Sequence, residues 1–213
     1  MKTFLRFFFY HFYHSLAFTY DLVAAIVSIG RWNEWVRTAL PHVRGPRVLE
    51  IGFGPGHLQV ELNRGGFNTL GIDESPQMIR KTRARLGQMF HRPAALARGL
   101  AQNLPFASST LDSVVATFPS EYIVDMRTLS EVWRVLRPGA RLVVVPVAWF
   151  TGRSLADAAA AWLFKVTGQG RSLTEDAEAR ILARFSEAGF RAGISRAEVR
   201  QSVVIVVVAE KSL

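Results

Sequence analysis

The chain contains no cysteine among its 213 residues. Disulfide bonds, metal sites built on thiolates and covalent catalysis through sulfur are therefore excluded. Acidic residues are also scarce, because 17 Asp and Glu stand against 26 Lys and Arg, which gives a formal net charge of +9. A surplus of this size favours polyanionic surroundings such as nucleic acid or an anionic bilayer, but it does not define a function by itself.

Acidic residues are absent altogether from one long segment, residues 77–98. A solvated helix face is the simplest interpretation of such a segment, and contact with lipid headgroups or RNA phosphates is the alternative. The basic side chains of this flank are Arg80, Lys81, Arg83, Arg85, Arg92 and Arg98.

The N-terminal segment lacks the roughly 20 consecutive apolar residues that a membrane-spanning helix needs. Nine of the first twenty residues are aromatic, but Arg6, His11 and His14 interrupt them. A secretory signal peptide also fits poorly, because the stretch is aromatic rather than leucine-rich and no small-residue cleavage site follows. We predict that residues 1–45 form an aromatic helical lid or interfacial segment, with simple packing against the domain as the alternative.

The most informative segment is VLEIGFGPGHL, residues 48–58, in which an apolar run ends in three glycines at alternate positions. Glycine permits positive φ and lets a ligand approach the backbone where a Cβ would collide, beside the N-terminus of the next helix. The dinucleotide pattern G-x-G-x-x-G would place its third glycine at His57, so the spacing argues against NAD. The segment is typical of a strand and loop that cradle a nucleotide-like cofactor.

A second apolar strand, residues 69–72, ends in the carboxylate of Asp73. A carboxylate at this position can accept hydrogen bonds from both hydroxyls of a ribose. Together with Glu50 in the preceding strand, the glycine loop and Asp73 predict an adenosine site, and an ordinary turn is the alternative.

Further motifs follow in order along the chain: NLPF at 103–106, LDSVVA at 111–116 and VLRPG at 135–139. With the glycine loop and Asp73, they resemble the ordered motifs of class I S-adenosylmethionine-dependent methyltransferases, over roughly residues 47–145. The resemblance is close to the small bacterial methyltransferases of type 11, which are grouped with those of ubiquinone and menaquinone biosynthesis. Residues 20–35 are similar to the segment that these quinone enzymes place ahead of the glycine loop.

Helical periodicity alternates with short apolar runs along the chain, which predicts an α/β domain with a parallel sheet. The resemblance implies a Rossmann-like three-layer sandwich over residues 46–213, whose mostly parallel seven-stranded sheet has an antiparallel last strand beside strand five. The expected helices are 21–39, 58–64, 75–87, 126–136 and 179–188, and the expected strands are 47–51, 69–72, 96–98, 111–116, 141–146, 191–199 and 202–209.

Residues 149–170 are predicted to form an apolar helical insertion. In the resembling family, elements here and at the N-terminus cover the methyl-acceptor pocket, so two apolar covers indicate a greasy or aromatic substrate. Extra core packing is the alternative interpretation.

The resemblance also assigns cofactor-binding residues. The glycines would hold the methionine moiety, Asp73 the ribose and Met78 the adenine, although plain core packing would explain Met78 equally well. The family's acid for the adenine amine is replaced here by Leu100, which leaves the backbone of Ala101 and the side chain of Gln102. The full set is Tyr20, Glu50, Gly52, Gly54, Gly56, Asp73, Glu74, Met78, Ala101, Gln102 and Phe118.

No obligatory catalytic triad is expected, because the positive sulfur of S-adenosylmethionine already activates the methyl group, and no metal is expected. A phenol or an activated ring carbon as acceptor would benefit from a general base. His57 is more simply a helix-start residue, and His11 is more simply an interfacial polar group. The candidates for the base are His14, Tyr20, Glu121 and Tyr122.

We therefore expect an S-adenosylmethionine-dependent methyltransferase that acts on a small apolar, aromatic or lipid-like acceptor. A cytoplasmic location is expected, with a peripheral position at the inner membrane face left open, as is the oligomeric state. Methylation of RNA is one alternative, but nucleic acid is disfavoured because no RNA-binding motif is appended. A non-catalytic scaffold that binds the cofactor is the other alternative.

Overall fold

The computed structural model describes residues 30–91, 93–151 and 174–212. The candidate residues His14 and Tyr20 lie outside the described residues, as does Arg92 of the basic flank. The same holds for most of the predicted N-terminal lid and most of the predicted helical insertion.

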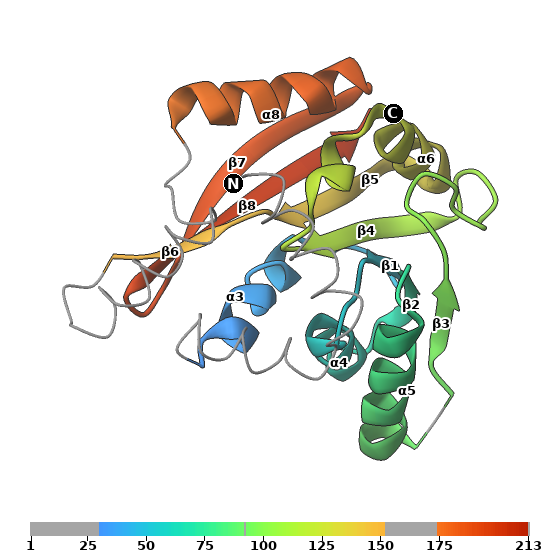
Figure 1. Ribbon diagram of the computed structural model, residues 1–213. Helices are drawn as coiled ribbons and strands as arrows, with labels where there is room; N and C mark the ends of the chain where they lie inside the picture. The colour runs from blue at the N-terminus through green and yellow to red at the C-terminus, as the bar shows by residue number, and fades with distance from the viewer. Residues whose placement is uncertain (1–29, 92, 152–173, 213) are drawn as a thin grey trace, which may run out of the picture.

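The described strands form one sheet in the order β3-β2-β1-β4-β5-β8, with β6 and β7 also paired to β8 (Figure 1). Strands β5 and β6 pair with successive parts of one side of β8, and β7 pairs along its other side. Neighbours among β1 to β5 run parallel, whereas β8 runs antiparallel to β5, β6 and β7. The mixed sheet with an antiparallel last strand is therefore confirmed. The strands are β1 Arg47–Ile51, β2 Asn68–Asp73, β3 Ala95–Arg98, β4 Leu111–Thr117, β5 Leu136–Val145, β6 Ala148–Phe150, β7 Phe190–Val199 and β8 Ser202–Lys211.

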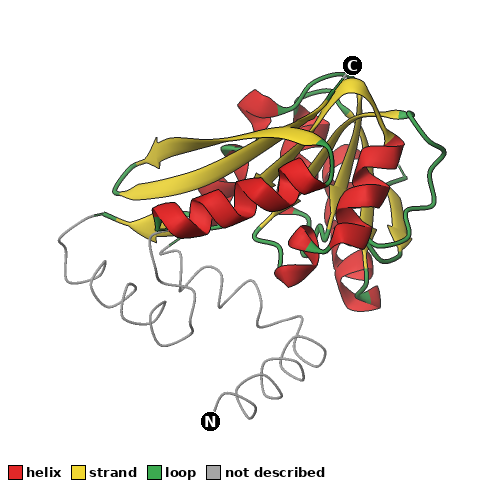
Figure 2. Ribbon diagram, turned by 90° about the horizontal axis from the view of Figure 1, so that it is seen from above, coloured by secondary structure: helices red, strands yellow, loops and turns green. Residues whose placement is uncertain are grey.

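Helices cover both faces of the sheet, which confirms the three layers (Figures 1 and 2). Trp35 of α3 and Leu58 of α4 belong to the apolar cluster on one face, while Leu129 of α6 and Phe185 of α8 belong to the cluster on the other. The described helices are α3 Trp32–Arg37, α4 His57–Arg64, α5 Pro76–Phe90, α6 Met126–Val135 and α8 Glu175–Glu187, with short 3-10 turns η1 Leu40–His42 and η2 Glu121–Val124.

Strand β5 begins five residues before the predicted start at Arg141, so Pro138 and Gly139 of the VLRPG motif lie inside it. The reason is an irregular ladder, in which Leu111 pairs with Leu136 but Ser113 pairs with Arg141. The extra residues on β5 bulge out of the pairing, with Gly139 at φ +73°. A bulge of this kind lets a strand hold residues that would otherwise end it.

Two other predictions were wrong in part. A helix was expected over 21–39, of which the structure describes residues 30–39. Within them the helix is limited to the six residues of α3, and the 3-10 turn η1 follows. Trp149 and Phe150 were expected in the helical insertion but form β6, an eighth strand that pairs with β8. Pro146 interrupts the strand between β5 and β6, because proline has no N–H to give to a ladder.

Candidate active site

The candidate site lies where the chain order of the sheet reverses. Strands β1 and β4 are neighbours, but the chain leads from β1 toward β2 and β3 and from β4 toward β5 on the other side. In open α/β sheets, ligands bind outside the carboxyl ends of the strands at such a switch point. The glycine loop follows β1 here, and residues 118–124 follow β4.

The three glycines of the loop all have positive φ, +67° at Gly52, +52° at Gly54 and +82° at Gly56. A Cβ at Gly56 would lie 2.4 Å from the Cγ2 atom of Thr82, so packing requires glycine there. A Cβ at Gly54 would meet no atom within 4 Å, so the space beside its Cα is open to a ligand. The loop is thus a cradle built from backbone.

Helix α5 holds this loop in place through two side chains that sequence reasoning did not single out for this role. The Thr82 hydroxyl donates to the Gly54 carbonyl at 2.8 Å, and the Arg85 guanidinium donates to the Pro55 carbonyl at 2.6 Å. Arg85 also lies 3.3 Å from Nδ1 of His57, the first residue of α4. Their spacing of three residues on one helix face is the signal that could have indicated a shared target.

Asp73 joins the second strand to the glycine loop. Its Oδ2 atom accepts from the Gly54 N–H at 2.8 Å, and its Oδ1 atom accepts from the Ser75 N–H at 2.8 Å. Burial raises the pKa of Asp73, although these two N–H groups lower it. Each carboxylate oxygen keeps a second lone pair for a hydroxyl of a ligand. Glu74, also predicted to bind the cofactor, is exposed, and its carbonyl accepts from Arg98.

Glu50 is the most deeply buried acid of the site, with 1% of its surface exposed. Its Oε2 atom has no hydrogen-bond partner in the described structure. Burial raises the pKa of this carboxyl well above its usual value, the neighbouring charge of Asp73 raises it further, and a hydrogen bond with Gln59 lowers it. A buried carboxyl with an orphaned oxygen fits a cationic ligand group, such as an ammonium or a sulfonium.

Tyr122 closes over the start of the loop. Its hydroxyl donates to the Ile51 carbonyl at 3.3 Å. A Cβ on Gly52 would lie only 2.5 Å from the Oη atom of Tyr122. Burial raises the pKa of Tyr122, as do the charges of Asp73 and Glu50. A phenol in this state keeps its proton, so the geometry favours a hydrogen-bond donor over the general base predicted from the sequence. Glu121, the other described candidate for the base, is exposed.

The residues predicted to surround the adenine lie in two separate parts of the structure, a small apolar cluster on α5 and the segment that contacts the start of α6. Met78 is buried in a small cluster with Phe53 and Ile79, so core packing already accounts for it. Ala101 is buried, and the Gln102 side-chain amide donates to Oδ2 of Asp125, the N-cap of α6, at 3.1 Å. Contact of these residues with an adenine stays a prediction.

The ring of Phe118 packs in an aromatic cluster that the sequence did not indicate, and its predicted contact with the cofactor stays a prediction. The ring centroids of Phe118 and Trp32 are 4.4 Å apart, and Trp35 lies 6.1 Å from Phe118. Phe150 completes the cluster at 5.4 Å from Trp35. The aromatic cluster, Trp32, Trp35, Phe118 and Phe150, joins residues from three distant parts of the chain.

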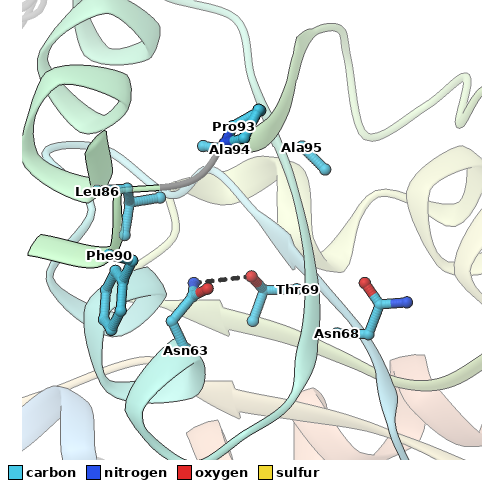
Figure 3. A pocket seen from close by; sticks show the side chains of 8 residues that line it. All are labelled: Asn63, Asn68, Thr69, Leu86, Phe90, Pro93, Ala94 and Ala95. Atoms are coloured by element: carbon cyan, nitrogen blue, oxygen red, sulfur yellow. Dashed lines mark hydrogen bonds between the residues drawn. The ribbon is translucent and has the colours of Figure 1, made fainter.

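A cavity of about 100 Å³ lies at the end of the sheet opposite the glycine loop (Figure 3). It is lined by the ends of α4 and α5 and the starts of β2 and β3, including Asn63, Thr69 and Phe90. The Asn63 amide donates to the Thr69 hydroxyl at 2.8 Å across its wall. Because these strands start here rather than end, the cavity is separate from the glycine loop.

Neither a metal site nor a membrane span is found in the part of the chain that the structure describes. The described residues contain no group of three or more His, Cys, Asp or Glu that could hold a metal ion. None of the described helices is long and apolar enough to cross a bilayer.

Comparison with known proteins gives a consistent family. Residues 49–144 match the sequence profile of a protein family described as a methyltransferase domain. The chain is 32% identical over 136 residues to a demethylmenaquinone methyltransferase of Thermobifida fusca, covering 62% of this chain and 58% of that protein. It is 35% identical over 136 residues to the Mycolicibacterium paratuberculosis protein of the same name, covering 62% and 56%. The chain thus spans less than two thirds of these relatives.

Solved structures share the fold at low sequence identity. A SAM-dependent methyltransferase of Thermotoga maritima superposes with a TM-score of 0.62 at 17% identity, covering 95% of this chain and 99% of that one. A SAM-dependent methyltransferase of Aquifex aeolicus superposes with a TM-score of 0.59 at 18% identity, covering 84% and 88%.

Proposed function

We propose that this chain, which the comparisons support as a class I S-adenosylmethionine-dependent methyltransferase, transfers a methyl group from that cofactor to a small apolar, aromatic or lipid-like acceptor. The observation that carries the proposal is the backbone cradle at Gly54, set between the buried carboxyl of Glu50 and the half-buried carboxyl of Asp73. An open backbone loop flanked by two acids suits a ligand that carries positive charge and vicinal hydroxyls.

The residues of the site would each hold a different part of the cofactor. Glu50 would face the cationic portion, because its orphaned Oε2 atom lacks a partner. Asp73 would accept from the ribose hydroxyls while it keeps its bonds to Gly54 and Ser75. When bound, S-adenosylmethionine supplies a methyl group that its positively charged sulfur already activates.

The protein's contribution to the reaction is alignment and exclusion of water. An acceptor atom held in line with the methyl group would gain that group and lose one proton, so the site would need to hold the acceptor in place and take up that proton. Effective molarities of aligned groups correspond to about 7–11 kcal/mol of the barrier. Tyr122, which keeps its own proton, would serve as a donor at the loop, while Glu121, His14 and Tyr20 remain candidates for the proton acceptor.

A quinone-like acceptor is our first candidate. The relatives from Thermobifida fusca and Mycolicibacterium paratuberculosis are both named demethylmenaquinone methyltransferase, at 32% and 35% identity. The names of these relatives support an apolar ring as the acceptor, and a position at a membrane surface would then bring the protein to its substrate. Nothing in the described site favours RNA over such a ring.

Isothermal titration with S-adenosylmethionine and S-adenosylhomocysteine tests the cofactor, with NADH as the control. We expect micromolar binding of the two sulfur compounds and none of NADH. A reduced naphthoquinone incubated with protein and cofactor should then gain one methyl group by mass spectrometry. Cofactor binding without transfer to quinol, phenol or lipid acceptors would favour the scaffold alternative, and absence of cofactor binding would overturn the proposal.

A further inference from the structure

We infer, on the basis of the proposed function, that Glu131 and Arg134 of α6 are positioning residues for the adenine of the cofactor. The two side chains hold the loop of residues 99–106, which carries the backbone of Ala101. Held in this way, the loop distinguishes adenine from other purines. Both residues act through the loop and not by contact with the cofactor.

Glu131 and Arg134 lie one turn apart on α6 and bind the loop as a unit. The Arg134 guanidinium donates twice to the Glu131 carboxylate, from Nε at 2.7 Å and from Nη2 at 2.8 Å. The same carboxylate accepts from the Leu104 N–H at 2.8 Å, and Arg134 Nη2 donates to the Leu104 carbonyl at 3.0 Å. Arg134 Nη1 donates to the Phe106 carbonyl at 2.7 Å. The pair therefore fixes both backbone groups of one loop residue and a third group two residues further on.

The value of this ion pair lies in its geometry. The Glu131 and Arg134 side chains are 21% and 34% exposed, and a partly exposed ion pair by itself adds little to stability. The hydrogen bond from Arg134 lowers the pKa of the Glu131 carboxyl, as does the Leu104 N–H, although burial raises it. The carboxylate therefore stays charged, and the planar fork of arginine holds it in one orientation.

The loop begins beside the acid that is proposed to bind the ribose. Strands β2 and β3 run parallel, so both end at the same edge of the sheet. The Gly99 N–H donates to the carbonyl of Asp73 at 3.2 Å. Ala101 is buried in the same apolar cluster as Ile72, the residue before Asp73. A base attached to a ribose at Asp73 would therefore meet the backbone at Ala101.

The loop offers its backbone to a base more than its side chains. Leu100 is 50% exposed but has no polar group, and the Gln102 amide already donates to Asp125. A turn runs from Leu100 to Asn103, whose N–H donates to the Leu100 carbonyl at 3.1 Å. Within the described part of the protein, the N–H groups of Ala101 and Gln102, at the centre of this turn, form no hydrogen bond.

A backbone N–H that is fixed in space can distinguish purines. Adenine presents an acceptor at N1 beside an amino group, whereas hypoxanthine presents an N–H at N1 beside a carbonyl. A loop arranged for the first pattern leaves its groups unpaired against the second, and unpaired polar groups are the basis of strong rejection. The turn is held at one end by Gly99 and at the other by the bonds to Leu104, so its selectivity depends on Glu131 and Arg134.

Isothermal titration of the full chain with S-adenosylhomocysteine and S-inosylhomocysteine tests this inference. We expect the wild type to bind the adenosyl compound about tenfold more tightly. Arg134→Met leaves the Leu104 and Phe106 carbonyls without their donor and should reduce this ratio to about threefold or less. Arg134→Lys keeps the charge but not the fork, so its ratio should lie between the two, and it tests the inference even if Arg134→Met does not fold.

Arg64→Met is the matched control. Arg64 pairs with Glu61 at 2.8 Å on α4, with the same order and spacing as Glu131 and Arg134. Among the described residues, Arg64 donates to no loop carbonyl. The control should therefore keep the ratio of the wild type.

The ratio of the two affinities separates positioning from a merely structural role. If Arg134→Met and Arg134→Lys weaken both ligands equally, or if the wild type does not distinguish the two bases, the inference is overturned. Ligand-observed NMR with adenosine and inosine repeats the comparison without the homocysteine part. If S-adenosylmethionine does not bind but adenosine is preferred over inosine, and Arg134→Lys reduces that preference, the proposed function fails and the assignment of the base site stands.

Discussion

Two carboxyls of the candidate site, Glu50 and Asp73, are held in different ways. Asp73 has a backbone N–H on each oxygen, whereas Glu50 is fully buried with one oxygen unpaired. Asp73 therefore acts as a structural link as well as a candidate ligand residue, and Glu50 is kept at a cost in folding free energy. Residues that lower stability for function are common at binding sites.

Replacement of Asp73 by alanine should affect both cofactor binding and stability. We expect affinity for S-adenosylmethionine to fall at least tenfold and unfolding free energy to fall by about 1–3 kcal/mol, because two N–H groups lose their acceptor. Asp73→Asn keeps one acceptor oxygen and should lose less stability. Calorimetric titration and urea unfolding measure the two effects, and unchanged affinity would contradict the assignment of Asp73 to the ribose.

Glu50→Gln should change the pH dependence of stability. The pKa of Glu50 is raised in the folded protein, so the folded state prefers the protonated carboxyl and stability falls as pH rises from the ordinary carboxyl pKa to the raised one. The glutamine variant lacks this loss and should unfold at higher urea concentration than the wild type above that window. Urea midpoints from pH 4 to pH 8 without cofactor check this, and a variant that is less stable at neutral pH would argue against it.

At the scale of elements, the site depends on helices that are held from outside their own segment. Helix α5 holds the glycine loop through Thr82 and Arg85. Helix α6 is held at its C-terminal end by Lys211 of β8, whose Nζ atom donates to the carbonyls of Trp133 and Leu136 at 2.8 and 2.7 Å. These bonds satisfy carbonyls that a helix end leaves without partners.

Thr82→Val removes the hydrogen bond to Gly54 but keeps the side-chain volume. The variant should lose about 1 kcal/mol of stability and bind S-adenosylmethionine severalfold more weakly, because the loop is less fixed. Arg83→Ala, an exposed change on the same helix, is the control and should stay within about 0.5 kcal/mol of the wild type. Equal cofactor affinity in the two variants would show that α5 does not hold the loop for binding.

Lys211→Met should lower the unfolding free energy by about 1–3 kcal/mol, since two carbonyls lose a charged donor. The contact of Nζ with the Trp133 ring, at 3.8 Å from its centroid, is lost as well. Arg191→Met, on the exposed face of β7, serves as the control in urea unfolding. A loss no greater than that of the control would contradict a role for Lys211 in holding α6.

At the scale of the whole molecule, part of the positive charge is used internally. Arg85 and Arg98 of the basic flank donate to backbone carbonyls, while Arg80 and Arg83 are exposed on α5. The solvated helix face expected from the sequence thus accounts for Arg80 and Arg83, and the net charge of +9 acts over the surface as a whole.

Binding to phosphatidylglycerol vesicles should accordingly be weak and sensitive to salt. We expect co-sedimentation at low ionic strength that falls steeply as salt is added, because screening removes attraction between exposed charges. Neutral phosphatidylcholine vesicles are the control. Binding that persists at high salt would instead indicate insertion of apolar side chains.

Local pattern was sufficient for much of the fold. Strand β1 has the predicted bounds, β2 extends its predicted bounds by one residue at each end, and β4 extends by one residue at its C-terminal end. Helix α4 begins at His57 instead of Leu58. The glycine loop and Asp73 were found because each directly follows an apolar strand. The start of β5 was missed because its bulge depends on the pairing with β4, which periodicity along one strand does not report.

The sequence by itself determined the α/β class, the glycine loop and the acid that follows the second strand, because these are properties of adjacent residues. The tertiary structure decided that Thr82 holds Gly54, that Tyr122 covers Gly52 and that Trp32 stacks on Phe118. Each of these contacts joins segments far apart in the chain, so it depends on the order in which the strands assemble. That order, with β1 beside β4, brings the glycine loop and Phe118 of the aromatic cluster to the same end of the sheet.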